Sequence, residues 1–325
     1  MLEPSGIHHV TAIATDPQRN IDFYAGVLGL RLVKRTVNFD DPTSYHFYFG
    51  DEIGRPGSLL TFFPWPNARR GRQGAGQAAV TSFAIVPGSV GFWLDRLLRQ
   101  GVEFEQPATR FDGERVIALK DPDGLLLELV SHQRVEQCEP RLDLGPEAQV
   151  PAEHAIRGVY SVTLWQDGHQ QTAELLTDTM GFKLVREQGS IYRYTADDGR
   201  PGTIVDVRVV PGLWPGVMGA GTVHHVAFRA ADSAKQIAAH DELQARGLNV
   251  TEVLDRDYFT SVYFREPGGV LFEIATDGPG FTVDEPQETL GRALKLPPWL
   301  EARRFEIEAL LPNIHLPLDL PGPNA

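Results

Sequence analysis

Apolar and polar residues alternate along the chain in a pattern that repeats as one strand, one helix and three strands. The run Ile7–Ile13 is typical of a strand, and the segment after it is helical in pattern and ends at Gly29. A glycine directly after the last periodic residue is a usual helix end, and short runs rich in aromatic and β-branched residues predict strands. The first copy has its strands over 7–13, 31–37, 45–49 and 58–63 and its helix over 16–28.

The same pattern returns three times. The first strand and helix of the later copies are expected over 80–86 and 89–100, over 159–165 and 170–180, and over 223–228 and 232–246. Every copy has a glycine that ends its helix and a turn glycine before its last strand. These are Gly29, Gly101, Gly181 and Gly247, and then Gly57, Gly124, Gly202 and Gly269. Glycines that recur at equivalent places over the whole chain indicate an internal repeat.

The repeat predicts an α+β fold of four βαβββ modules in two tandem domains, each forming cupped mixed sheets with the helices outside. The predicted ranges are an N-terminal pair of modules over 1–135, a linker over 136–156, a C-terminal pair over 157–280 and an extension over 281–325. A helix is expected over Trp299–Leu311 in the extension. We favour a packing role for the extension, with a lid or a dimer contact as the alternative.

Adjacent histidines occupy equivalent places in the first and fourth copies, as His8–His9 and His224–His225. Successive strand residues point to opposite faces of a sheet. The apolar positions that follow each pair must face the covering helix. His9 and His225 therefore point into the concave side, whereas His8 and His224 share the parity of the apolar face.

The last strand of each copy adds a second set of candidate ligands, four residues past each turn glycine. These residues are Thr61, Glu128, Asp206 and Glu273. The concave face of the first and fourth copies thus carries His9, Thr61, His225 and Glu273, and that of the other two carries Ser82, Glu128, Ser161 and Asp206. Two imidazoles and one carboxylate form a facial ligand set for Fe(II) that leaves coordination positions open. Thr61 is a poor metal ligand, and the second and third copies, which have no histidine at these positions, are expected to bind no metal.

Composition limits the partners and the compartment. The chain has 325 residues, of which 42% are hydrophobic and 22% charged, the balance of a soluble globular protein. A net charge of −13 argues against nucleic acid or an anionic membrane as a partner. Cys138 is the only cysteine, so no internal disulfide can form, and together with an N-terminus unlike a signal peptide this predicts a cytoplasmic protein. A homo-oligomer is left open.

Several motifs resemble a known superfamily. The turns Asp121–Leu125 and Glu266–Val270, the strand histidines and the βαβββ units are similar to the vicinal oxygen chelate superfamily, which includes glyoxalases, extradiol dioxygenases and bleomycin-resistance-type binding proteins. More narrowly, the chain resembles the hydroquinone ring-cleaving dioxygenases over nearly its whole length. The segments that carry this resemblance are His8–Thr11, Phe23–Tyr24, Leu32–Thr36, Tyr45–Phe49, Gly268–Glu273, Gly280–Thr282 and Asp284–Glu285.

The resemblance implies Fe(II), with manganese as an alternative, on His9, His225 and Glu273. It also implies roles close to the metal for His8, Thr11, His224, Arg256 and Tyr263. Parity places Thr11 on the same face as His9, whereas His8 and His224 reach the site only if the strands twist near their ends. A cation at Arg256, expected on a loop at the pocket mouth, can bind a phenolate. Tyr263 and His224 are the acid–base candidates.

The implied activity is the opening of a small hydroquinone-type (1,4-dihydroxy) aromatic ring with O2. Aromatic wall residues are expected at Phe47, Phe49, Phe62, Trp65, Tyr258 and Phe259. The alternatives are an extradiol catechol dioxygenase, a glyoxalase-type metal-dependent isomerase or lyase, and a non-catalytic aromatic-binding protein. Glyoxalase-type enzymes generally use four protein ligands, so Thr61 argues against that alternative.

Overall fold

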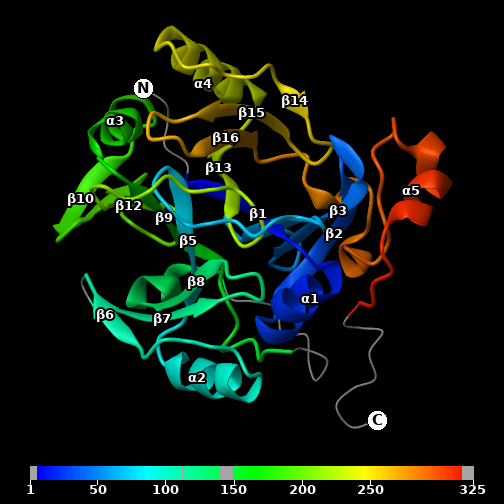
Figure 1. Ribbon diagram of the computed structural model, residues 1–325, viewed down its shortest axis with the longest axis horizontal. Helices are drawn as coiled ribbons and strands as arrows, with labels where there is room; N and C mark the ends of the chain where they lie inside the picture. Colours follow the sequence, from blue (N-terminus) through cyan, green and yellow to red (C-terminus); the bar gives the residue numbers. More distant parts are fainter. Residues whose placement is uncertain (1–5, 112, 140–148, 317–325) are drawn as a thin grey trace.

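The computed structural model describes residues 6–111, 113–139 and 149–316 (Figure 1). The first five residues, the middle of the predicted linker and the last nine residues of the predicted extension lie outside these ranges. Within them the four βαβββ modules are present, which confirms the predicted α+β class.

The first module consists of β1 (Ile7–Ala14), α1 (Pro17–Ile21), β2 (Arg31–Asn38), β3 (Asp41–Gly50) and β4 (Leu59–Pro64). The second consists of β5 (Gln77–Ile85), α2 (Val90–Arg99), β6 (Ala108–Arg110), β7 (Glu114–Lys120) and β8 (Leu126–Ser131). The third consists of β9 (Val159–Gln166), α3 (Gln170–Glu174), β10 (Lys183–Gln188), β11 (Ile191–Thr195) and β12 (Ile204–Val209). The fourth consists of β13 (Val223–Ala230), α4 (Ser233–Ala245), β14 (Leu254–Asp255), β15 (Thr260–Arg265) and β16 (Leu271–Thr276).

Two of the predicted helices change type along their length. α1 begins at the N-cap Asp16, whose carboxylate accepts the backbone N–H groups of Gln18 and Arg19, and it continues as a π-helical segment, Asp22–Val27. α3 likewise continues as the π-helical segment Leu175–Thr179. A side-chain cap satisfies donors that the first helical turn leaves unpaired, which explains why the first helix starts where it does.

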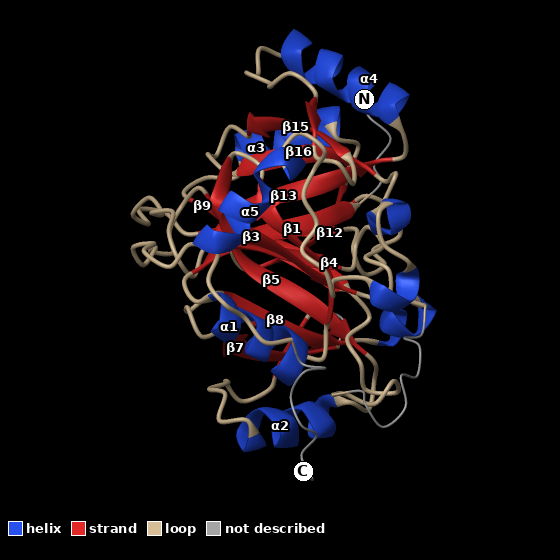
Figure 2. Ribbon diagram, turned by 90° about the vertical axis from the view of Figure 1, so that its right-hand side faces the viewer, coloured by secondary structure: helices blue, strands red, loops and turns tan. Residues whose placement is uncertain are grey.

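The strands form two eight-stranded sheets, each of which combines two modules (Figures 1 and 2). One sheet has the order β14-β15-β16-β13-β1-β4-β3-β2 and joins module one to module four, and the other has the order β10-β11-β12-β9-β5-β8-β7-β6 and joins module two to module three. In each sheet the two central first strands run antiparallel, and each first strand runs parallel to the last strand of its own module. Both sheets therefore cross the predicted division into N-terminal and C-terminal pairs, whose boundaries stay a prediction.

The central strands are buried on both faces. All eight residues of β1 are buried, and most of the buried apolar side chains of both sheets join one large cluster. α2 and α4 lie at opposite ends of the molecule, outside the sheets (Figure 2). The first strands are thus withdrawn from solvent, and so are the polar side chains that they carry, such as His9.

The extension packs along the edge of the first sheet, as Figure 1 shows for α5 (Arg304–Leu310) beside β2 and β3. Its backbone bridges to β2 through Arg35 and Leu294, and Tyr45 donates a hydrogen bond to the carbonyl of Pro312 at 3.0 Å. Before α5 the segment Glu301–Arg303 is a 3-10 turn, so the helix is shorter than the predicted range. Among the described residues, no helix is long and apolar enough to cross a membrane.

Candidate metal centre

Three predicted ligands converge at the middle of the first sheet. His9 on β1, His225 on β13 and Glu273 on β16 each offer one ligand atom, and these atoms all lie within 4.8 Å of one another. His9 Nε2 is 3.3 Å from His225 Nε2 and 3.4 Å from Glu273 Oε2, and His225 Nε2 is 2.9 Å from Glu273 Oε2. All three side chains are buried, and Glu273 is fully so. The parity of the first and last strands therefore places these residues as the sequence predicts.

This triangle of atoms fits a metal ion. Two ligands at about 2.1 Å from a first-row divalent ion, at a right angle to each other, lie about 3.0 Å apart. The three observed separations are close to that value, as expected for one face of an octahedron. Within the described residues, Glu273 Oε2 is also a buried atom without a hydrogen-bond donor. A cation bound by the three atoms would remove that deficit, because buried carboxylates need a counter-charge.

His8 and His224 reach the ligands because each lies in a β-bulge. In the pairing of β1 with β13, the register skips His8 on one strand and His224 on the other. A bulge re-aims a side chain that simple alternation would send to the opposite face. His8 Nδ1 lies 2.9 Å from His9 Nδ1, and His224 Nδ1 lies 2.8 Å from His225 Nδ1. The parity argument does not hold at these bulges, and both rings lie beside the candidate ligands, the alternative that the sequence left open.

For a metal bound through Nε2, these contacts would fix the tautomers of the candidate ligands. A ligand that binds metal through Nε2 carries its hydrogen on Nδ1 and donates it to an outer-shell partner. His9 then donates to His8, whose Nε2–H donates to the carbonyl of Thr276 at 3.2 Å. Burial lowers the pKa of His8 and of His224 to about 3, so both rings are neutral and accept at Nδ1.

A cavity of about 320 Å³ opens on the candidate ligands. Its lining includes His9, His225 and three other predicted residues, His224, Arg256 and Tyr263. The ring of Tyr263 stands edge-on to His225, with centroids 5.5 Å apart. Burial raises the pKa of the Tyr263 hydroxyl, so it keeps its hydrogen and can donate it. The pocket therefore holds an aromatic-sized space with a hydrogen-bond donor beside the ligands.

Arg256 is held at the cavity by an unusual loop. It follows β14, and the next residue, Asp257, has a φ of 68° in the left-handed region. The guanidinium lies 5.4 Å from the centre of the Tyr263 ring and 3.3 Å from the carboxylate of Asp40. The loop and its position at the pocket agree with the expectation from the sequence.

The predicted aromatic wall is only partly correct. Trp65 and Phe259 line the cavity, together with Phe39 and Phe63, which the sequence did not single out. Tyr258 does not line the cavity, and its hydroxyl donates a hydrogen bond to Asp284. The remaining three predicted wall residues, Phe47, Phe49 and Phe62, lie in the main core. They are wrong because strand alternation turns them to the helix-covered face, the face opposite to the pocket.

Thr61 occupies the place that corresponds to Glu273 in the first module. Its hydroxyl contacts Thr11 Oγ1 at 2.7 Å and His46 Nε2 at 3.1 Å. Thr11, a predicted site residue, thus lies on the expected face and next to Thr61. His46 lines the cavity and was missed, although it alternates with Tyr48 in Tyr45–Phe49 and so shares a strand face with it.

The equivalent face of the second sheet is occupied by arginines. Arg193 makes two hydrogen bonds of 2.7 Å to Asp206 and a further ion pair with Glu114. Arg110 pairs with Glu128 at 2.9 Å, and Ser82 donates to the same carboxylate at 2.7 Å. Guanidinium groups supply the positive charge beside these carboxylates, and the expectation that these modules bind no metal stays a prediction.

This network gives a prediction. Tyr160 donates to Glu114 Oε1 at 2.6 Å, and a hydrogen bond to a charged group contributes about 1.5–3 kcal/mol. Tyr160→Phe should lower the free energy of unfolding by about that amount, measured by urea denaturation, while the metal content stays unchanged. Loss of metal in this variant would contradict the view that the arginine network of the second sheet is independent of the candidate metal site in the first.

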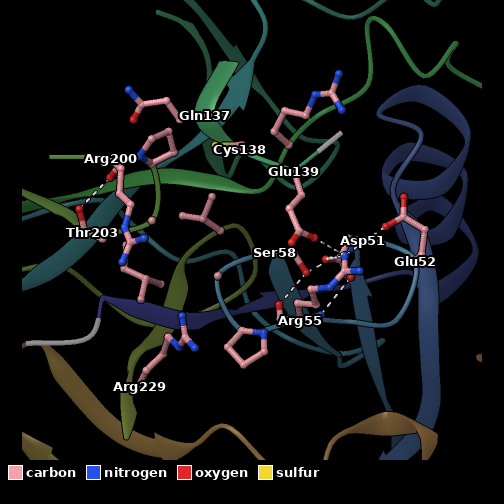
Figure 3. Close-up of a pocket in the computed structure, with 17 residues that line it drawn as sticks. Asp51, Glu52, Arg55, Ser58, Gln137, Cys138, Glu139, Arg200, Thr203 and Arg229 are labelled. Atoms are coloured by element: carbon pink, nitrogen blue, oxygen red, sulfur yellow. Dashed lines mark hydrogen bonds and ion pairs between the residues drawn. The ribbon is translucent and has the colours of Figure 1, made fainter. Parts of the chain in front are cut away.

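A second hollow, of about 250 Å³, lies where the turns at Gly57 and Gly202 meet (Figure 3). Arg55 is its most connected side chain, paired with Asp51 at 3.1 Å and with Glu139 at 3.6 Å. Cys138 also lines it. None of the three candidate ligands borders this hollow, and Arg55 pairs with all three acidic residues that line it, Asp51, Glu52 and Glu139.

Comparison with known proteins shows the family and agrees with the fold. The family model described as Glyoxalase/Bleomycin resistance protein/Dioxygenase superfamily matches residues 6–129 and 158–274, so the chain belongs to this superfamily. Solved structures include that of a provisionally named dioxygenase from Bacillus subtilis subsp. subtilis str. 168, with a TM-score of 0.91, 45% identity and coverage of 97% of this chain and 99% of that one. Glyoxalase I from Zea mays has a TM-score of 0.61 at 16% identity, covers 84% and 92% of the two chains, and shows the fold alone.

Two curated relatives cover nearly the whole chain. MhqO of Bacillus subtilis (strain 168), provisionally named a ring-cleaving dioxygenase, is 47% identical over 310 residues, which are 94% of this chain and 96% of that protein. A protein named chlorohydroquinone/hydroquinone 1,2-dioxygenase, from Sphingobium indicum (strain DSM 16413 / CCM 7287 / MTCC 6362 / UT26 / NBRC 101211 / UT26S), is 35% identical over 312 residues, 93% and 94% of the two chains. The chain is thus similar over more than nine tenths of its length to proteins with ring-cleaving dioxygenase names.

Proposed function

We propose that this protein is an Fe(II)-dependent dioxygenase that opens a hydroquinone-type aromatic ring with O2. The observation that carries the proposal is the buried triangle of His9, His225 and Glu273, beside which a threonine takes the place of a fourth ligand. A facial set of two histidines and one carboxylate leaves positions open for substrate and oxygen. The name of the Sphingobium relative, which refers to hydroquinones, supports the choice of substrate class.

The protein would contribute binding, orientation and exclusion of water. An Fe(II) ion on the three ligands would lower the pKa of a coordinated phenol and make electrons available to dioxygen. Tyr263 would donate its hydroxyl hydrogen to the phenolic oxygen, and Arg256 would hold negative charge at the cavity mouth. Phe259 and Trp65 would cover the ring faces and keep the pocket dry.

Oxygen uptake tests the proposal directly. Protein reconstituted anaerobically with Fe(II) should consume oxygen with hydroquinone and form a ring-opened product, detected by mass spectrometry. Catechol and a glutathione hemithioacetal, tested side by side, would separate the extradiol and glyoxalase alternatives. Absence of uptake across a panel of substituted hydroquinones and catechols would refute the proposal, and isomerisation of the hemithioacetal would favour the glyoxalase alternative.

A variant at Tyr263 tests the proposed donor. Tyr263→Phe keeps the ring beside His225 but removes one hydrogen bond to a charged oxygen, a contact of about 1.5–3 kcal/mol. It should lower kcat/KM by roughly 10- to 100-fold, since 1.4 kcal/mol corresponds to a factor of ten. Iron content should match that of the unmodified protein. An unchanged kcat/KM would show that the hydroxyl plays no part in the reaction.

A further inference from the structure

We infer that His46 is a positioning residue for the reacting groups: its Nε2–H holds the Thr61 hydroxyl, which in turn orients the hydroxyl of Thr11 beside the metal ligands. The inference rests on the proposed function, because its consequence is for a ligand at the open metal positions. His46 is half-buried and lines the cavity, where its ring lies 4.1 Å from that of Tyr48 and 4.4 Å from that of Phe63.

The polar residues of this network follow one another across neighbouring strands. Tyr48 on β3 is the register partner of Thr61 on β4, and Thr61 is the partner of Thr11 on β1. Thr11 in turn pairs with His225 on β13. The row therefore leads across the sheet to one of the candidate ligands. His46 lies two residues before Tyr48 on the same strand face. Its ring contacts both Tyr48 and Thr61, the first two residues of this row.

The internal repeat supports a donor at this position. Tyr263 is the register partner of Glu273, as Tyr48 is of Thr61. Two residues earlier in each strand stand Ser261 and His46. Ser261 donates its hydroxyl hydrogen to the carboxylate of Glu273, which can only accept. His46 in the first module makes the corresponding contact, at 3.1 Å, to Thr61. Both modules thus orient the residue on their last strand from the same place.

The hydrogen positions follow from the chemistry of the four groups. Burial raises the pKa of the Tyr48 phenol well above its usual value, so the phenol keeps its hydrogen and can donate it. It donates to His46 Nδ1 at 2.9 Å. Burial also lowers the pKa of His46, and a neutral ring that accepts at Nδ1 has its hydrogen on Nε2.

That hydrogen is then donated to Thr61. Within the described residues, the Thr61 hydroxyl has two polar partners, His46 and Thr11. Since it accepts from His46, its own hydrogen goes to Thr11 at 2.7 Å. Thr11 accepts this hydrogen bond from Thr61. Its own hydroxyl hydrogen can then be donated to a group bound at the candidate metal centre. Both contacts also occupy the Thr61 hydroxyl, so it is not available as a fourth protein ligand to the metal.

The tautomer of His46 is measurable without metal or substrate. Nitrogen-15 NMR of the metal-free protein with labelled histidine should show His46 as the neutral Nε2–H form, its signals assigned by their loss in His46→Gln. Tyr48→Phe should shift the Nδ1 resonance, because Nδ1 loses its donor. A hydrogen on Nδ1, or a charged ring, at neutral pH would overturn the inference.

A double-mutant cycle tests the coupling between His46 and Thr11. His46→Leu and Thr11→Val should each lower kcat about tenfold, the effect of one hydrogen bond, with iron content retained. The double variant should be no slower than the slower single one, because both changes break the same chain of contacts. His46→Gln, which keeps an N–H at the ε position, should restore most of the rate.

The two measurements distinguish a failure of the inference about His46 from a failure of the proposed function. Independent, multiplicative effects in the cycle would refute the coupling, as would full activity of His46→Leu. If the unmodified protein consumed no oxygen with any phenol, the proposed function would fall, and the tautomer measurement would still decide whether His46 donates to Thr61.

Discussion

Replacement of His225 by alanine is expected to leave the protein folded and unable to hold iron. His225 Nε2 lies 2.9 Å from Glu273 Oε2 and 3.3 Å from His9 Nε2, so its loss removes one of the three converging atoms. Loss of an outer-shell partner alone typically costs about 10- to 100-fold in metal affinity, and loss of a ligand should cost more. Metal analysis after anaerobic reconstitution measures the effect, with circular dichroism as the check on folding.

Ser161→Ala is the matched control. Ser161 occupies the position of His225 in the third module and is equally buried, but it lies in the sheet whose carboxylates are paired with arginines. This variant should bind iron as the unmodified protein does. If His225→Ala also kept its iron and its oxygen uptake, the assignment of the ligand triangle would be wrong.

The second large effect is expected from Lys34→Met. Lys34 on β2 is fully buried, and its ammonium group lies 2.5 Å from both Asp284 Oδ1 and Glu285 Oε2 of the extension. Removal of one partner from a buried ion pair costs about 3–5 kcal/mol, because the remaining charge is left without compensation. The free energy of unfolding should fall by about that amount, as measured by urea denaturation.

A charge-neutral variant separates the pairing from the packing. Lys34→Met combined with Asp284→Asn and Glu285→Gln leaves no buried charge in the cluster and should recover much of the lost stability. If the triple variant were as unstable as Lys34→Met alone, the loss would arise from packing of the lysine stem.

The same cluster anchors the loop that carries Arg256, because Tyr258 on that loop donates a hydrogen bond to Asp284 at 3.1 Å.

The convergence of the three candidate ligands could be predicted because their facing depends on local periodicity. His9, His225 and Glu273 each follow from the alternation of a single strand, counted from a turn glycine or an apolar position. The repeat then aligned the modules, and the same count found Thr61, Glu128 and Asp206 at the corresponding places. Alternate residues of a strand face the same side whichever strand lies next to it, so this count requires no information about the neighbouring strand.

The outer residues of the site could not be predicted in this way. His8 and His224 turn toward the ligands because of bulges, and a bulge is a property of two paired strands. His46 became recognisable only when the register matched Tyr48 with Thr61. The aromatic residues were divided wrongly between pocket and core for a related reason, because hydrophobicity alone does not say which face of a strand is covered.

The sequence by itself determined the four modules, the α+β class and the three side chains that point into one concave face. These properties arise from patterns within single elements. The tertiary structure decided that module one joins module four, that Lys34 is buried against the extension, and that arginines fill the second concave face. Each of these depends on contacts between segments far apart in the chain, and the packing of the whole molecule selects them.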